Sequence, residues 1–174
     1  MKLLGVIATA AVVGAVAVGT GNSQPGSVDD AWQGLGLKIV RKASHHDPAC
    51  PPHTFGEVNQ LMATMPCVSL SRTLMTLADD KGTTIVVHIA WVEYGTRAGA
   101  REFKRIEDIH GTGDVSPLPG ATIGIADVRF TAHHYDSTIN GTTTVTAEAE
   151  PLTGQPDDRL LEDVTRIAVL EPRP

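Results

Sequence analysis

The chain begins with an apolar segment, residues 3–19, that carries no charged side chain and follows Lys2. Such a segment partitions into a membrane because no charge opposes its transfer from water. Ala15-Val16-Ala17 has the small-x-small pattern of a signal-peptidase site, while the length of the run also approaches that of a membrane span. Residues 1–19 are therefore predicted to be a signal peptide or a membrane anchor. The protein is expected to be extracytoplasmic, either secreted or anchored to the cell membrane by residues 3–19.

The rest of the chain divides into a polar stretch and one domain. Residues 20–52 are rich in Gly, Ser and Pro at both ends and are predicted to be a tether and loop. Within them, the apolar residues of 37–40 could form a short edge strand. Residues 53–174 are long enough for one hydrophobic core and are predicted to be the extracytoplasmic domain.

Export gives meaning to the two cysteines, Cys50 and Cys67. An even number of cysteines in an oxidising compartment favours a disulfide, and two free buried thiols are the alternative. The sequence contains no CxxC motif, so thioredoxin-like redox chemistry has no support.

The charge balance excludes one class of partner. The chain has 14 Lys and Arg against 20 Asp and Glu, a formal net charge of -6, and 4% aromatic residues. Nucleic-acid binding relies on neutralising phosphates and on aromatic stacking, so it is not expected here. We expect an unknown protein or a small ligand as partner, no cofactor, and membrane contact only through the N-terminal segment.

The periodicity of apolar residues predicts seven elements. They are helix 54–65, strands 67–78 and 83–94, helix 96–109, strands 123–139 and 142–150, and helix 157–170. Thr54 with Glu57 forms a capping-box pattern at the first helix, and Asn140-Gly141 is a strong hairpin signal. The order predicts an α+β fold: a four-stranded antiparallel sheet built from two ββα units with an extra N-terminal helix, and helices on one face.

The second hairpin carries the candidate catalytic residues. A two-residue Asn-Gly turn places His133 opposite Glu148, with Tyr135 on the same face, which is predicted to be wet. A His–Glu pair there could act as a general base or as half of a metal site. The alternative is a solvated polar sheet face without a role.

Further histidines suggest weaker candidates. His45, His46, Asp47 and His53 cluster next to Cys50 and could bind zinc or copper, although their spacing matches no standard ligand motif. His88 lies in an apolar strand and is expected to be semi-buried and bonded to the backbone or to Thr73. No nucleophile-elbow, zincin, Walker or Rossmann motif is present.

Four stretches carry a resemblance: residues 89–93 (IAWVE), 106–115 (IEDIHGTGDV), 133–137 (HHYDS) and 147–151 (AEAEP). Through them, residues 53–174 resemble a group of uncharacterised exported proteins of high-GC actinobacteria. The resemblance implies a compartment and a lineage, and it carries no activity.

These observations favour a non-enzymatic extracytoplasmic binding or interaction module, because no nucleophile, metal or cofactor motif is present. One alternative is a small His/Glu-dependent enzyme or metal-binding protein that uses the polar sheet face. Another is a sensor or accessory domain held at the membrane.

Overall fold

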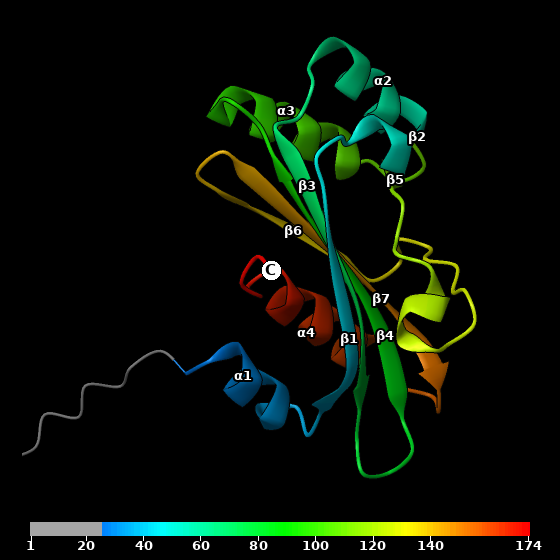
Figure 1. Ribbon diagram of the computed structural model, residues 1–174. Helices are drawn as coiled ribbons and strands as arrows, with labels where there is room; N and C mark the ends of the chain where they lie inside the picture. The colour runs from blue at the N-terminus through cyan, green and yellow to red at the C-terminus, as the bar shows by residue number, and fades with distance from the viewer. Residues whose placement is uncertain (1–25) are drawn as a thin grey trace, which may run out of the picture.

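The computed structural model describes residues 26–174 (Figure 1). The predicted signal peptide or anchor, residues 1–19, lies outside the described residues. Within residues 26–174, no helix is both long and apolar enough to cross a membrane.

The centre of the fold is an antiparallel sheet of five strands in the order β1-β3-β4-β7-β6. The strands are β1 (Lys38–Asp47), β3 (Ser69–Ala78), β4 (Thr84–Glu93), β6 (Tyr135–Asn140) and β7 (Thr143–Thr153). The prediction of an α+β fold with an antiparallel sheet is confirmed. The prediction of four strands is wrong, because β1 pairs with β3 as an additional edge strand.

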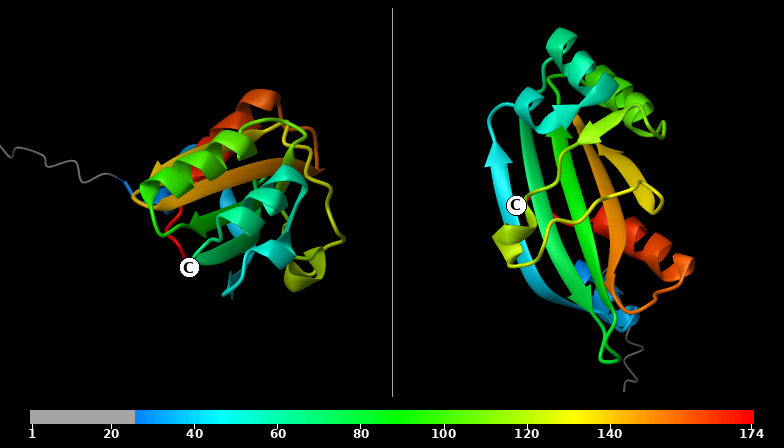
Figure 2. Two further views of the ribbon diagram at one scale, coloured as in Figure 1. Left: turned by 90° about the horizontal axis from the view of Figure 1, so that it is seen from above. Right: turned by 90° about the vertical axis from the view of Figure 1, so that its right-hand side faces the viewer.

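Helices cover both faces of this sheet, so the prediction of helices on one face is wrong (Figures 1 and 2). We call one side the α1/α4 face, after α1 (Val28–Gly34) and α4 (Asp158–Ala168). The other is the α2/α3 face, after α2 (Gly56–Thr64) and α3 (Arg97–Glu107). The central strands β3 and β4 are therefore buried on both sides along nearly their whole length.

The core on the α1/α4 face is continuous and apolar. Alternate residues of β4, including Val87 and Ile89, pack with Trp32 of α1 and Leu161 of α4 in one cluster. Trp32 Nε1 donates a hydrogen bond to Glu171 Oε1 at 2.9 Å, which satisfies the buried indole. This face is a conventional hydrophobic core.

The α2/α3 face has two separate apolar clusters. One lies under α2 and α3, and the other lies under the loop that contains the 3-10 helix η2 (Gly120–Ile123) (Figure 2, right). The strands that pass beneath both clusters place polar side chains between them: Arg72, His88 and Glu148 are each no more than 5% exposed. We call these three residues the polar band.

A disulfide and a small sheet fasten α2 to the rest of the fold. Cys50 and Cys67 form a disulfide with a Cα–Cα distance of 6.2 Å, as predicted. Between them lie the 3-10 helix η1 (Pro51–His53) and β2 (Thr54–Phe55), which pairs with β5 (Gly113–Val115). The predicted helix 54–65 therefore begins later than expected, because Thr54 is part of β2 and does not cap the helix.

The predicted tether and loop, residues 20–52, contains two regular elements. The capping box of Ser27 and Asp30 starts α1, and β1 pairs with β3 over nine positions. The edge strand suggested at residues 37–40 is real and longer than expected. Within the described residues, the folded unit thus starts about 25 positions earlier than residue 53.

The second hairpin has a different register from the predicted one. Asn140 pairs with Thr143, so the turn residues are Gly141 and Thr142, and Tyr135 faces Glu148. Residues 123–134, predicted as the first part of this strand, form η2 and irregular loop instead. The prediction that His133 lies opposite Glu148 is therefore wrong.

Candidate ligand-binding site

Three residues of neighbouring strands form a row across the α2/α3 face. His88 of β4 pairs with Glu148 of β7, and Glu148 pairs with Tyr135 of β6. Directly opposed residues in antiparallel strands point to the same side. The face was predicted to be wet, yet Glu148 is 4% exposed because α3 and β5 cover it. Burial turns these polar groups from solvated side chains into groups that need partners.

Two more carboxyl groups meet Glu148 under this cover. Glu107 is the last residue of α3, and Asp114 is the middle residue of β5. The Asp114 carboxyl lies beside those of both Glu107 and Glu148. Glu107 is 7% exposed, and neither of its oxygens has a hydrogen-bond partner within residues 26–174. Glu107 and Glu148 are buried and Asp114 is half-buried, and the three residues form a carboxyl cluster in which neither oxygen of Glu107 has a hydrogen-bond donor within residues 26–174.

Burial and mutual repulsion control the protonation of the carboxyl cluster. Burial, followed by the neighbouring carboxyls of Asp114 and Glu148, raises the pKa of Glu107 well above its usual range. Burial and Asp114 raise the pKa of Glu148 to about 9. With a pKa of about 9, Glu148 holds a proton at neutral pH unless a cation replaces it, and the pKa of Glu107 is shifted in the same direction.

A backbone amide opposes the rise in the pKa of Glu148. Ala132 N–H donates to Glu148 Oε2 at 2.7 Å. Ala132 adopts φ 55°, and within residues 26–174 no other residue except glycine has a positive φ. A left-handed alanine is strained, and the surrounding contacts must hold it in place. The segment before β6 thus uses an unfavourable backbone conformation to reach Glu148.

The cluster opens into a cavity of about 520 Å³. Its wall is formed by the α3–β5 connection, by residues 129–132 and by Tyr135, and Glu107 and Asp114 line it. Phe55, Phe130 and Tyr135 contribute aromatic rings. The volume is in the range of small-molecule sites, about 300–1,000 Å³.

Two glycines bring β5, and with it Asp114, to this position. Gly56 and Gly113 face each other in an isolated bridge, with φ of +63° and +138°. A Cβ on Gly56 would lie 2.3 Å from Thr112 O, and one on Gly113 would lie 2.2 Å from Phe55 O. Only glycine allows the two backbones to approach so closely. The close approach of the two backbones therefore explains the glycine at position 113 in the Gly111-Thr112-Gly113 stretch.

The candidate residue Tyr135 lies in the row, but its hydroxyl is engaged. Tyr135 Oη donates to Asp108 Oδ1 at 3.1 Å, and Ser137 Oγ donates to the same oxygen at 2.6 Å. Burial raises the pKa of the Tyr135 hydroxyl far above its usual value. Tyr135 lines the cavity, but its hydroxyl is held by the hydrogen bond to Asp108. This contact disfavours Tyr135 as a catalytic acid or base.

The candidate residue His133 lies elsewhere. It is exposed and stands beside His134, with 4.6 Å between ring centroids. His88 occupies the position opposite Glu148 instead, and burial lowers its pKa. The sequence predicts a semi-buried His88 bonded to the backbone or to Thr73, and the side chain is fully buried. The Thr73 side chain points to the opposite face and bonds Ser44. The backbone of Thr73 and of Val115 lies beside the imidazole, but neither ring nitrogen makes a hydrogen bond of good geometry within residues 26–174.

The candidate metal ligands of the first loop are brought together only in part. His45 Nε2 and His53 Nε2 lie 3.3 and 3.0 Å from Asp47 Oδ1. Arg72 Nε donates to Asp47 Oδ2 at 2.9 Å, and both side chains are buried. His46 points to the opposite face and lies 3.1 Å from Ser71 Oγ. Asp47 is thus already compensated by Arg72, and it anchors one end of the polar band.

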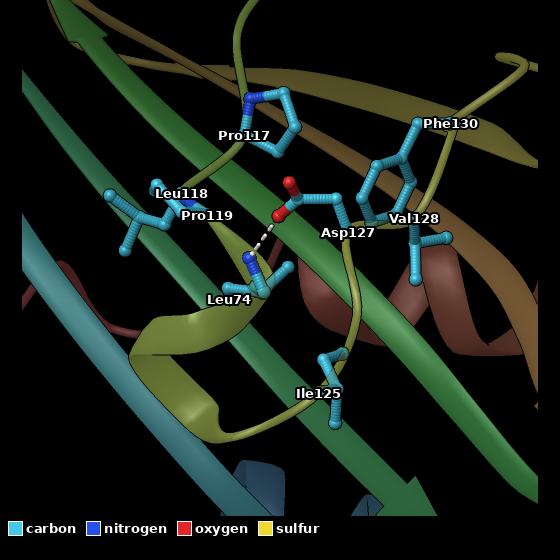
Figure 3. A pocket seen from close by; sticks show the side chains of 9 residues that line it. Leu74, Pro117, Leu118, Pro119, Ile125, Asp127, Val128 and Phe130 are labelled. Carbon is cyan, nitrogen blue, oxygen red and sulfur yellow. Dashed lines mark hydrogen bonds between the residues drawn. The ribbon is translucent and has the colours of Figure 1, made fainter.

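A second, apolar cavity of about 240 Å³ lies between the η2 loop and the sheet (Figure 3). Leu74, Leu118 and Phe130 line it, and its one carboxylate, Asp127, accepts a hydrogen bond from Gly120 N at 2.8 Å. Because that carboxylate is already satisfied, this cavity offers no polar group that demands a ligand.

Sequence reasoning missed Glu107 and Asp114. Glu107 lies in a helix whose residues are largely charged, and it follows Ala100 and Phe103 at the spacing of the buried face. That spacing could have identified it as a buried acid. Asp114 has no such signal, because its position depends on the pairing of β5 with β2.

Comparison with known proteins adds no family: no family model, curated protein or solved structure matches the chain. The Cys50–Cys67 disulfide fits an oxidising, extracytoplasmic location.

Proposed function

We propose that this protein is an extracytoplasmic binding module that takes the ammonium or guanidinium group of a small organic ligand into the cavity beside Glu107, Asp114 and Glu148. The observation that carries the proposal is Glu107, which lines the cavity, is 7% exposed and has no partner for either oxygen within the described chain. A buried carboxyl without a donor costs free energy. A cationic donor would supply the missing hydrogen bonds and compensate the cluster's charge.

The cavity suits an organic cation better than a bare metal ion. Its volume of about 520 Å³ is far larger than one ion requires. The rings of Phe55, Phe130 and Tyr135 offer π faces, which attract ammonium and guanidinium groups. Arg129 and His110 also line the cavity but are exposed to solvent, whereas Glu107 is buried.

Binding is favoured over catalysis because the hydroxyl groups that line the cavity are occupied. Thr112 Oγ1 donates to the carbonyl oxygens of Ile106 and Ile109. Thr131 Oγ1 donates to Glu150 Oε1, and Tyr135 Oη donates to Asp108. A hydroxyl nucleophile must be free and stand beside a general base, and no hydroxyl in the described part of this cavity meets that condition.

The test is calorimetric titration with benzylamine and agmatine, and with benzyl alcohol as a neutral analogue of benzylamine. We expect both amines to bind and benzyl alcohol not to bind. Glu107→Gln removes the negative charge while keeping the shape, and we expect it to weaken amine binding at least about tenfold, or about 1.4 kcal/mol. Glu102→Gln, on the same helix but outside the cavity, is the matched control and should leave binding unchanged.

Equal binding by wild type and Glu107→Gln would refute the proposal, as would failure of both amines to bind. Binding of Ca²⁺ without binding of amines would show that the cluster holds an inorganic ion instead. Because the carboxyls must lose protons to pair with a cation, affinity should rise with pH, and titrations in buffers of different ionisation enthalpy should reveal proton release.

A further inference from the structure

We infer that His133, His134 and Asp158 form a binding site for a transition-metal ion of the Zn²⁺ or Cu²⁺ class. The inference is independent of the amine site, because none of the three residues lines that cavity. Each residue offers one ligand atom, and these atoms all lie within 4.8 Å of one another. Within residues 26–174 this is the one group of three such side chains at that spacing.

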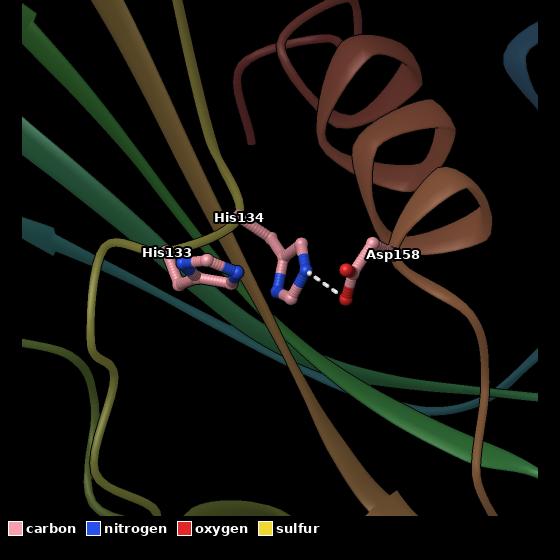
Figure 4. Close-up of side chains that lie close together, drawn as sticks. All are labelled: His133, His134 and Asp158. Atoms are coloured by element: carbon pink, nitrogen blue, oxygen red, sulfur yellow. Dashed lines mark hydrogen bonds and ion pairs between the residues drawn. The ribbon is translucent and has the colours of Figure 1, made fainter.

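The spacing of the ligand atoms fits a tetrahedral metal. His134 Nε2 and Asp158 Oδ1 are 3.2 Å apart (Figure 4). Two ligands that are each about 2.0–2.1 Å from a tetrahedral Zn²⁺ are separated by about 3.3 Å. His133 approaches the His134 ring edge-on, with centroids 4.6 Å apart, so small side-chain rotations would bring the third ligand to the same ion.

The backbone places the central ligand and leaves the outer two adjustable. His134 is 7% exposed, and its carbonyl accepts a hydrogen bond from Ala149 N at 3.0 Å, which ties it to β7. Asp158 is the first residue of α4, and its side chain is 79% exposed. Asp157 caps the helix, so Asp158 is free of that task. A buried histidine flanked by two mobile ligands can adjust to the geometry of an ion.

A simple ion pair between His134 and Asp158 explains less. It involves only His134 Nε2 and Asp158 Oδ1. It gives no role to the ring of His133, which stands beside that of His134. A metal ion binds neutral imidazoles and thereby accounts for two adjacent histidine rings together with a carboxylate.

The other histidine cluster provides a control. His45 and His53 also flank a carboxylate, but Asp47 is held by the buried guanidinium of Arg72. A metal there would have to displace or approach a fixed positive charge. The two clusters contain the same residue types and differ in whether the carboxylate is free.

The experiment is titration of the purified protein with Zn²⁺ by calorimetry and with Co²⁺ by visible absorption, which reports tetrahedral coordination. We expect one ion per chain. His133→Ala and Asp158→Asn change exposed side chains, so folding should persist, and each should weaken binding at least about tenfold. The control variant His45→Ala/His53→Ala should bind as wild type does.

Three results would overturn the inference. They are no binding of Zn²⁺ or Co²⁺ up to about 100 μM, wild-type affinity in both His133→Ala and Asp158→Asn, or loss of binding in His45→Ala/His53→Ala alone. Circular dichroism of each variant separates loss of the site from loss of the fold. None of these outcomes depends on whether amines bind near Glu107.

Discussion

The two faces of the sheet are built from the same strands and serve different purposes. On the α1/α4 face, β4 contributes Val87 and Ile89 to a continuous apolar cluster closed by α1 and α4. On the α2/α3 face, the same strand contributes His88 to the polar band, which lies between two separate apolar clusters. One face is therefore a conventional hydrophobic core, and the other buries polar groups at a cost in stability.

The difference shows how one strand can meet two demands. Because successive side chains point to opposite faces, a polar residue such as His88 can be introduced without disturbing its neighbours in the opposite core. The cost appears as buried polar atoms without partners in the described chain, which include those of His88 and Glu107. Three changes test whether the two faces differ in this way.

The largest effect is expected from adjacent positions of β4. Ile89→Ala leaves a cavity in the α1/α4 face and should lower the free energy of unfolding by about 4 kcal/mol. His88→Leu, one residue away and facing the other side, should leave it unchanged or raise it, because a buried imidazole without a partner is removed. Urea denaturation measures both variants. An equal loss in both would show that the two faces contribute alike.

The next effect comes from the disulfide that fastens the cover of the α2/α3 face. Replacing Cys50 and Cys67 by serine releases a loop that contains β2 and all of α2. In the chain-entropy model this costs about 3 kcal/mol, and the melting temperature should fall by about 10 °C. Hydrogen exchange should accelerate in α2 more than in α4. Equal acceleration of hydrogen exchange in α2 and α4 would argue that the disulfide does not fasten α2 separately. As a control, added reductant should not change the melting temperature of the double serine variant.

The smallest effect concerns pH. The pKa of Glu148 is raised in the folded state from an ordinary value of 4.5 to about 9. The folded state therefore binds more protons than the unfolded state between these values, and stability falls as pH rises. We expect the free energy of unfolding to fall by about 2 kcal/mol between about pH 6 and about pH 8. One proton can change it by at most about 1.4 kcal/mol per pH unit, so the expected loss lies below the limit for that interval.

The control for this pH dependence is a pair of charge-neutralising variants. Glu148→Gln should reduce the slope over that window, with the remainder due to Glu107, while Glu102→Gln, which lies outside the carboxyl cluster, should preserve the slope. Urea titrations at several pH values give the comparison. An unchanged slope in Glu148→Gln would assign the protons to another group.

Local signals in the sequence predicted several elements well. Alternating apolar residues predicted β3 and β4, and Asp157 and the Leu160–Leu161 pair predicted α4 within about two residues. The disulfide followed from two cysteines and an apolar leader. These features depend on periodicity, capping and chain composition, which act over a few residues and are written directly in the order of side chains.

Only the tertiary structure decided which side chains share a face and which are covered. The register of the second hairpin, the addition of β1 at the edge, and the meeting of Glu107, Asp114 and Glu148 depend on contacts between distant segments. The same holds for His134 and Asp158, which come from a loop and a helix. Periodicity repeats every two residues along a strand, so it cannot distinguish registers that differ by two, and it cannot say which element will cover a polar face.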